Sequence, residues 1–169
     1  MILGSSRLTL TPLIPSDHTY FHAVNTDPYV RKYLWDDQII EPKVSAEILV
    51  KNEIHFQNDG YGLWKLESKV ISQVIGYAGL WYFFDEVQPQ LLYVIERPYS
   101  GFGYATEVSR LIIDYAFSTL DFDYLIAATD AEHQASQKVA RQAGMKWVNK
   151  RIINGKATSF YRIDKANTV

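Results

Sequence analysis

The sequence predicts a mixed α/β fold in which the whole chain, 1–169, forms one domain. Segments that alternate apolar and polar residues, as strands do, are interleaved with segments whose apolar residues recur at helical spacing. A length of 169 residues is typical of one domain and is sufficient for a buried core. Apolar residues make up 47% of the chain and charged residues 21%, which indicates an ordinary globular protein.

The first third of the chain predicts one strand followed by helices. The alternating stretch RLTLTPL indicates a strand over 7–13. Helices are expected over 15–25, 27–34 and 41–58. Pro42 suits the first turn of the last of these helices, because a missing N–H costs nothing there.

The middle of the chain predicts antiparallel strands. Apolar segments lie over 61–67, 72–84 and 90–96. The gap between the first two is short and turn-like, which favours antiparallel pairing.

The last third predicts alternating helices and strands. Helices are expected over 104–120 and 134–144, the second closed by glycine. The short, wholly apolar segment 124–129 between them is typical of a buried strand in a parallel sheet. Residues 145–164 predict a β-hairpin around an Asn-Gly turn.

Charge and cysteine content exclude several classes of function. A net charge of −2 gives no electrostatic basis for nucleic-acid binding. The absence of cysteine excludes a cysteine nucleophile and zinc–thiolate sites, and it suits a reducing compartment such as the cytoplasm. The longest apolar stretch, 74–84, is too short and too glycine-broken to span a membrane. His18 and His22 share a helix face without an evident third ligand, so no metal is expected.

Residues 97–107, RPYSGFGYATE, place Gly101 and Gly103 between an apolar strand and a helix. Unpaired amides at a helix start carry partial positive charge, and glycines let an anion approach them closely. The spacing alone leaves open whether this loop holds a phosphate or is only a tight turn into the helix.

Two kinds of nucleotide loop fit these glycines poorly. A P-loop is excluded, because Gly103 is followed by Tyr104 and Ala105 rather than by Lys and Ser or Thr. A nicotinamide-binding oxidoreductase is a remote alternative. Thr106 stands where the dinucleotide fingerprint has Gly or Ala, although Asp130 mimics the acid that binds ribose.

The stretches LLYVIERPYSGFGYATEVSRLIIDYAF and AATDAEHQASQKVARQAGM resemble the GNAT acetyltransferases. The resemblance is to the RimJ/RimL-like branch, similar to ribosomal-protein-alanine N-acetyltransferases, which acetylates protein N-termini and some small amines. That branch typically reads E-x-G-Y, then W-G-(K/Q)-G-Y-A-T-E-A, then N-x-x-S. The N-terminal stretches RLTLTPLIPSD and VRKYLW also match its pattern, so the resemblance covers nearly the whole chain.

The resemblance implies a GNAT fold, in which the fourth and fifth strands of a mixed central sheet splay apart and helices cover both faces. It also implies acetyl-CoA as the donor cosubstrate. The pyrophosphate would lie on the turn formed by Ser100, Gly101, Phe102, Gly103, Tyr104 and Ala105. The pantetheine arm would run along the backbone of Tyr93, Val94 and Ile95.

In this family the acceptor amine attacks the thioester directly, and three residues here match catalytic or cofactor positions. The resemblance implies that the Val94 N–H stabilises the oxyanion and that Ser136 protonates the departing thiolate. Ser136 is alternatively a first-turn helix serine that satisfies backbone amides. His133 replaces the family asparagine, and it is either a contact to pantetheine or acceptor or a solvated loop histidine.

The sequence also departs from the family pattern. Ser100 replaces the tryptophan before the first glycine, and Phe102 replaces the Lys or Gln between the glycines, so phosphate would be held mainly by backbone. Gln90 replaces a frequent glutamate and cannot act as a base, which leaves Glu96 as the nearest carboxylate in sequence to serve as one.

The acceptor site is the least determined part of the sequence. Glu41 is a candidate to hold a cationic amine, and Trp35 and Tyr82 are candidates to line the site; the alternatives are a solvated loop and core aromatics. We expect an N-acetyltransferase acting on a protein N-terminus or small amine, as a monomer or homodimer, without nucleic-acid or membrane partners. Because Gln90 replaces the glutamate, a catalytically impaired CoA-binding or sensing module is the alternative.

Overall fold

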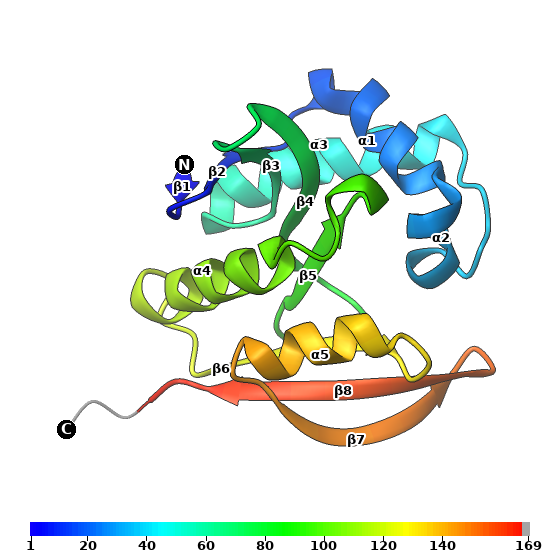
Figure 1. Cartoon of the computed structure of the whole chain (residues 1–169), viewed down its shortest axis with the longest axis vertical. Helices are drawn as coiled ribbons and strands as arrows, with labels where there is room; N and C mark the ends of the chain where they lie inside the picture. Colours follow the sequence, from blue (N-terminus) through cyan, green and yellow to red (C-terminus); the bar gives the residue numbers. More distant parts are fainter. Residues whose placement is uncertain (167–169) are drawn as a thin grey trace.

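The computed structural model, which describes residues 1–166, contains two antiparallel sheets (Figure 1). The first has the strand order β1-β2-β3-β4-β5 and the second the order β6-β8-β7. The strands are β1 (Leu3–Gly4), β2 (Leu8–Pro12), β3 (Leu63–Ser68), β4 (Gln73–Trp81), β5 (Gln90–Ile95), β6 (Tyr124–Asp130), β7 (Lys146–Ile153) and β8 (Lys156–Asp164). The helices are α1 (His18–Thr26), α2 (Pro28–Leu34), α3 (Pro42–Asp59), α4 (Tyr104–Ser118) and α5 (Gln134–Gln142).

Helices cover both faces of the first sheet, because its strands turn alternate side chains to two separate cores. On one face, residues of α1, α2 and α3 pack with Leu63, Tyr77 and Val94 of the sheet. On the other face, α4 packs against Trp64 and Leu80 among others. The expected α/β class is therefore confirmed.

The two sheets meet where β5 contacts β6. Within residues 1–166 no ladder joins these two strands, so they contact each other as the edges of separate sheets. The expectation of a wholly buried, parallel strand over 124–129 is wrong. β6 pairs antiparallel with β8, from Tyr124 opposite Asp164 to Asp130 opposite Thr158, and only alternate residues of β6 are fully buried. The C-terminal hairpin supplies this partner.

Turns end several elements as predicted. The hairpin turn Asn154-Gly155 has positive φ at both residues, 51° and 77°, the conformation that favours these residue types. Gly60 and Gly144 also have positive φ, 76° and 95°, after α3 and α5. β4 ends earlier than expected, at Trp81. None of the helices in the described part of the chain is both long and apolar enough to cross a membrane.

Candidate functional site

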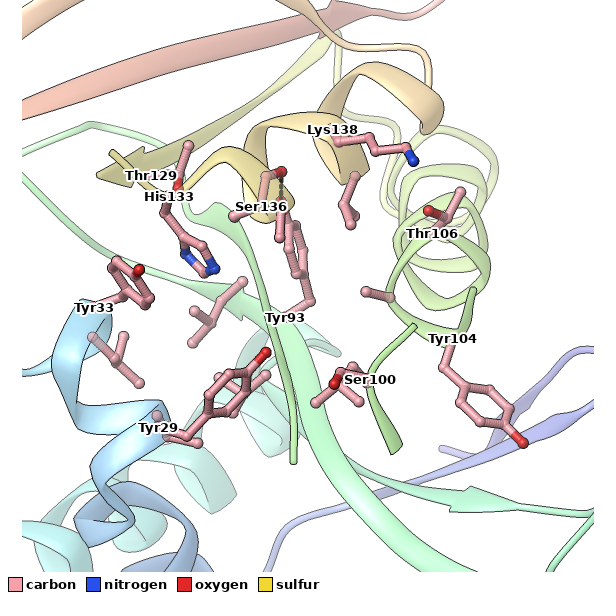
Figure 2. A pocket seen from close by; sticks show the side chains of 18 of the residues that line it. Tyr29, Tyr33, Tyr93, Ser100, Tyr104, Thr106, Thr129, His133, Ser136 and Lys138 are labelled. Carbon is pink, nitrogen blue, oxygen red and sulfur yellow. Dashed lines mark hydrogen bonds between the residues drawn. The ribbon is translucent and has the colours of Figure 1, made fainter. Parts of the chain in front are cut away.

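A cavity of about 530 Å³ lies where β5 and β6 meet (Figure 2). Its walls come from α2, from β5 and the loop after it, from the start of α4, from the end of β6 and from α5. The side chains labelled in Figure 2 are Tyr29, Tyr33, Tyr93, Ser100, Tyr104, Thr106, Thr129, His133, Ser136 and Lys138. The site is therefore built from segments that are spread along the sequence from Tyr29 to Gln142.

The glycine loop forms one end of this cavity. Gly101 and Gly103 have φ of 84° and 81°, a backbone conformation that glycine adopts readily. Within residues 1–166, the backbone N–H groups of 101–106 donate to no other protein group, and α4 begins at Tyr104. A Cβ built on Gly101 would meet nothing within 4 Å. The loop thus offers unpaired amides and open space, which is what a phosphate needs at a helix start.

An arginine from the distant N-terminal segment braces this loop. Arg7 Nη1 donates to the Phe102 carbonyl oxygen at 2.9 Å, and its Nε donates to Glu107 Oε2 at 2.6 Å. Glu107 also accepts from Ser5 Oγ at 2.6 Å and from the Arg7 backbone N–H at 3.1 Å. Burial raises the pKa of the Glu107 carboxyl, but these hydrogen bonds and the Arg7 charge outweigh it, and the pKa is lowered.

Tyr93 and Ser136 are linked inside the cavity. The Tyr93 hydroxyl donates to the Ser136 backbone oxygen at 2.8 Å, and its oxygen lies 3.0 Å from Ser136 Oγ (Figure 2). Burial raises the pKa of the Tyr93 phenol to about 12, although the hydrogen bond from Ser136 lowers it. The phenol therefore stays protonated at neutral pH and acts as a neutral hydrogen-bonding group.

His133 lines the same cavity at the start of α5. Its ring stacks on that of Tyr33, with centroids 3.8 Å apart and planes 8° from parallel. Burial lowers the pKa of the His133 imidazole; nearby Asp130 raises it, and Lys32 and Lys156 lower it further. The net pKa is below the ordinary value of 6.5. The ring is therefore uncharged at neutral pH.

A second, smaller cavity of about 170 Å³ adjoins the first. Tyr33, Thr129 and Asp130 line both cavities, so the two cavities are neighbours at these residues. Lys156, in the wall of the second cavity, lies between two carboxylates. Its Nζ is 2.6 Å from Asp130 Oδ2 and 3.1 Å from Asp36 Oδ1. Partial burial acts to lower the pKa of Lys156, but the hydrogen bonds and charges of Asp130 and Asp36 have the larger, opposite effect. The net pKa of Lys156 is therefore raised, and the side chain stays a charged ammonium.

Gln90 also lines the second cavity and is 1% exposed. Its Nε2 donates to the Phe83 carbonyl at 3.1 Å, whereas its Oε1 has no hydrogen-bond partner among the described residues. A buried, unpartnered acceptor is unusual in a protein interior.

The structure brings together most of the residues expected to hold the cofactor. The expected residues that line the first cavity are Tyr93, Val94, Ile95, Ser100, Gly101, Gly103, Tyr104, Ala105, His133 and Ser136. The Phe102 side chain is 62% exposed and lines neither cavity, so this residue contributes only backbone to the loop.

The expected base and acceptor residues lie elsewhere. Glu96 lines neither cavity, and its Oε2 accepts from the Tyr20 hydroxyl at 2.9 Å. Trp35 donates through Nε1 to Asn25 Oδ1 at 2.9 Å and lines neither cavity. Glu41 precedes α3, and the Tyr82 hydroxyl lies 2.6 Å from that of Tyr61; neither residue lines either of these two cavities.

The strand register also corrects the role expected for the Val94 amide. Glu96 N–H donates to Ile75 oxygen at 3.0 Å, and the register continues with Tyr77 opposite Val94. Antiparallel pairs alternate between hydrogen-bonded and non-bonded, so the Val94 N–H points at β4. The amides of its two neighbours in the strand, Tyr93 and Ile95, face the β6 side and are the ones available to the cavity.

Several lining residues were not predicted from the sequence. Tyr29 and Tyr33 stand one turn apart on α2, and this i, i+4 spacing in YVRKYL was the available signal. Lys138 and Gln142 are likewise one turn apart on α5. In the part of the chain that the structure describes, no group of three or more His, Asp or Glu residues is arranged to hold a metal ion.

Comparison with known proteins agrees with this architecture. Residues 7–146 match the family described as the acetyltransferase (GNAT) domain. The chain is 27% identical over 146 residues to the uncharacterized protein YkkB of Bacillus subtilis, covering 85% of this chain and 84% of that protein. It is 23% identical over 141 residues to the spermidine N(1)-acetyltransferase of Escherichia coli, covering 83% and 74%.

A solved structure of RimL, the ribosomal L7/L12 α-N-protein acetyltransferase, in complex with coenzyme A has the same fold. It superposes with a TM-score of 0.78 at 16% identity, over 97% of this chain and 98% of that one. Both sheets formed by residues 1–166 are antiparallel, which rules out the doubly wound parallel sheet that a nicotinamide site of the dinucleotide type requires. Since the family match spans most of the sequence, the chain belongs to the GNAT acetyltransferases.

Proposed function

We propose that this chain is an acetyl-CoA-dependent N-acetyltransferase of the RimJ/RimL-like branch, active in the cytoplasm as one domain over 1–169. Its acceptor is a primary amine, either a protein N-terminus or a small amine. The observation that carries the proposal is the continuity of the unpaired amides at 101–106 with the Tyr93–Ser136 pair inside one cavity. A long ligand with an anionic end and a reactive far end fits such a site.

The glycine loop is the proposed pyrophosphate site. The free amides and the open space at Gly101 favour an anion there. Lys138 adds a positive charge to the same cavity wall, which compensates for the polar Lys or Gln side chain that the family has at the position of Phe102. Acetyl-CoA, once bound, supplies an activated acetyl group as a thioester.

The reacting end of the donor is proposed to lie near Ser136. Amides of Tyr93 and Ile95 face β6 and can stabilise negative charge on the acetyl oxygen. Ser136 is the proposed proton donor to the sulfur, oriented by Tyr93. The second cavity is the proposed acceptor side, since it joins the first at Tyr33 and Asp130.

Binding and turnover test the proposal separately. Acetyl-CoA at a hundred times its Kd stabilises the folded state by about 2.7 kcal/mol, which a thermal-shift assay detects. We expect this shift with acetyl-CoA and none with NAD. Release of free CoA thiol is then measured with three acceptors: an alanine-initiated peptide, a serine-initiated peptide and spermidine. No shift with any CoA species would contradict the proposed function.

A CoA-binding module without catalysis is the second candidate. The observation that favours it is Gln90, which cannot serve as the base that a glutamate would provide. Stabilisation by acetyl-CoA without thiol release in the presence of any of the three acceptors would favour this candidate.

A further inference from the structure

The His133 side chain makes no hydrogen bond to any other residue in the described part of the chain. It is the N-cap residue of α5, yet its side chain makes no capping hydrogen bond to the helix. Within residues 1–166 neither ring nitrogen has a hydrogen-bonding partner, and the ring is held by stacking on Tyr33. Figure 2 shows the imidazole projecting into the cavity on the side of Tyr33. Both nitrogens are thus free to exchange a proton with a ligand.

The charged groups around His133 come from three elements. Asp130 on β6, Lys32 on α2 and Lys156 on β8 act on the ring, and the Asp130 charge is already paired with Lys156 at 2.6 Å. The other titratable groups that line the same cavity are Tyr29, Tyr33, Tyr93, Tyr99, Tyr104 and Lys138. None of these is a carboxylate that would hold the ring in its charged form. At neutral pH the imidazole is therefore in its uncharged form, which can accept a proton.

The other candidate bases are engaged or absent from the cavity. Gln90 has no basic form, and Glu96 is outside the cavity with its carboxylate on Tyr20. Asp130 faces the cavity but is bound by Lys156. Among the described residues that line the first cavity, His133 is the side chain that combines a free basic nitrogen with access to the space beside Ser136.

We propose that His133 is the general base of the reaction, a role that rests on the proposed function. The acceptor nitrogen forms a bond to the acetyl carbon as the carbon–sulfur bond breaks and its electron pair leaves on the CoA sulfur. The proton lost by the nitrogen passes to His133, and the sulfur takes a proton from Ser136. Exchange with solvent then returns a proton to Ser136 and removes one from His133, so a neutral amine passes one proton in net to the sulfur. An acceptor that arrives as an ammonium first loses its additional proton through His133 to solvent.

His133→Asn tests this role, because asparagine is favoured at a helix N-cap and restores the residue type that the family has there. We expect unchanged acetyl-CoA affinity by calorimetry. With spermidine or an alanine-initiated peptide, kcat is expected to fall on the order of 10²-fold. His18→Asn is the matched control: His18 lies on α1 outside both cavities and is expected to leave kcat unchanged.

A second acceptor separates a base from a positioning residue. Hydroxylamine is largely unprotonated at neutral pH, so its attack depends less on a base than that of an alkylammonium acceptor. We expect His133→Asn to reduce turnover of hydroxylamine, after subtraction of the uncatalysed reaction, far less than turnover of spermidine. Titration of the His133 ring by NMR in the free protein is expected to give a pKa below 6.5.

Two results would overturn the proposal while leaving the proposed function intact. One is an equal loss of turnover with hydroxylamine and with spermidine, which indicates a structural role. The other is wild-type kcat with spermidine in His133→Asn, which would show that the ring takes no proton from the acceptor. Wild-type protein that binds acetyl-CoA but acetylates no acceptor would overturn the catalytic role of His133. Wild-type protein that binds no CoA species would overturn the proposed function itself.

Discussion

Tyr93 on β5 and Ser136 on α5 share two contacts, 2.8 Å from the tyrosine hydroxyl to the serine carbonyl oxygen and 3.0 Å to the serine Oγ. A phenol carries a single proton. When that proton goes to the carbonyl, the Ser136 hydroxyl is the donor in the second contact. The pair therefore joins an edge strand of the first sheet to a helix beside the second sheet. It holds the Ser136 oxygen in place, and the serine proton has to leave Tyr93 to reach the sulfur.

Tyr93→Phe is expected to weaken both folding and turnover. The substitution leaves the Ser136 carbonyl without this donor and frees the serine hydroxyl to rotate. Loss of a buried hydrogen-bond partner costs about 1–3 kcal/mol of unfolding free energy. Urea unfolding and CoA-release kinetics measure the two effects. Since the Tyr93 pKa is about 12, the loss is expected to be the same from pH 6 to pH 9. A loss that varies over this range would contradict a neutral phenol.

Ser136→Ala is expected to separate catalysis from stability. The bond from Tyr93 to the carbonyl remains, so the unfolding free energy should change by less than about 1 kcal/mol. Turnover is expected to fall by roughly 10²-fold if the hydroxyl protonates the sulfur. Acetyl-CoA affinity should be retained. Unchanged turnover would refute the proposed acid role.

Gly101→Ala is expected to weaken acetyl-CoA binding, and the chain provides a matched control in Gly155→Ala. Both glycines have positive φ, 84° and 77°, and a Cβ on either meets no atom within 4 Å. The strain of alanine in this conformation is therefore similar, about 1 kcal/mol of stability. Only the first methyl enters the space in front of the free amides. Equal acetyl-CoA affinity in the two variants, measured by calorimetry, would argue against a phosphate at this loop.

The residues that the sequence assigned to the cofactor lie together in one cavity, whereas those assigned to the acceptor do not. The resemblance implied that the glycine loop, Tyr93 and Ser136 lie around one ligand, and the structure places all three in the first cavity. Arg7 could not be assigned to the loop, because its contact with Phe102 joins positions 95 apart in the sequence. No local pattern encodes such a long-range brace.

The residues assigned to the acceptor lie outside the two cavities for a related reason. Trp35 and Tyr82 were chosen by residue type, but hydrogen bonds to Asn25 and Tyr61 engage them away from the cavities. Which face of α2 points inward depends on how it packs against the sheet, and that packing turns Tyr33 inward. The parallel pairing predicted for the strand 124–129 was also wrong, because this strand pairs antiparallel with β8. An apolar run of six residues does not distinguish a parallel from an antiparallel neighbour.

Glu107→Gln is expected to lower stability at neutral pH and to lose this effect in acid. The Glu107 pKa is depressed in the folded state below its ordinary value of 4.5. Its contribution to stability is therefore present above 4.5 and is lost as the pH falls through the folded pKa. We expect a loss of about 1–2 kcal/mol at pH 7, from the hydrogen bonds to Arg7 and Ser5.

Unfolding by urea at pH 7 and at pH 3 checks the Glu107 prediction. Asp164→Asn is the control, since it makes the same chemical change at a carboxylate that is 65% exposed and pairs with Arg162. Little change is expected there, because exposed ion pairs contribute little. A Glu107→Gln penalty that persists unchanged at pH 3 would contradict a depressed pKa.

Gln90→Glu restores the residue type of the family, and it is expected to destabilise this protein rather than to supply a base. Gln90 is 1% exposed, and its amide donates to the Phe83 carbonyl. An ionised glutamate cannot donate to that carbonyl, so burial would raise the pKa of the new carboxyl and favour its protonated form. A raised folded pKa means that stability is lost as the pH rises through it. We expect a loss of about 2 kcal/mol or more at pH 8 and a smaller one at pH 5.

Two comparisons make the Gln90→Glu prediction decisive. Gln57→Glu introduces the same charge on the exposed surface of α3, and its effect on urea unfolding should be small at both pH values. In the second comparison, Gln90→Glu is combined with His133→Asn, and turnover of spermidine is measured. Because the new carboxyl is expected to remain protonated in its buried position, the double variant should stay as slow as His133→Asn alone. Recovery of turnover in the double variant at pH 8 would mean that a carboxylate at position 90 ionises and acts on the acceptor, and that the environment of Gln90 is more polar than its burial indicates.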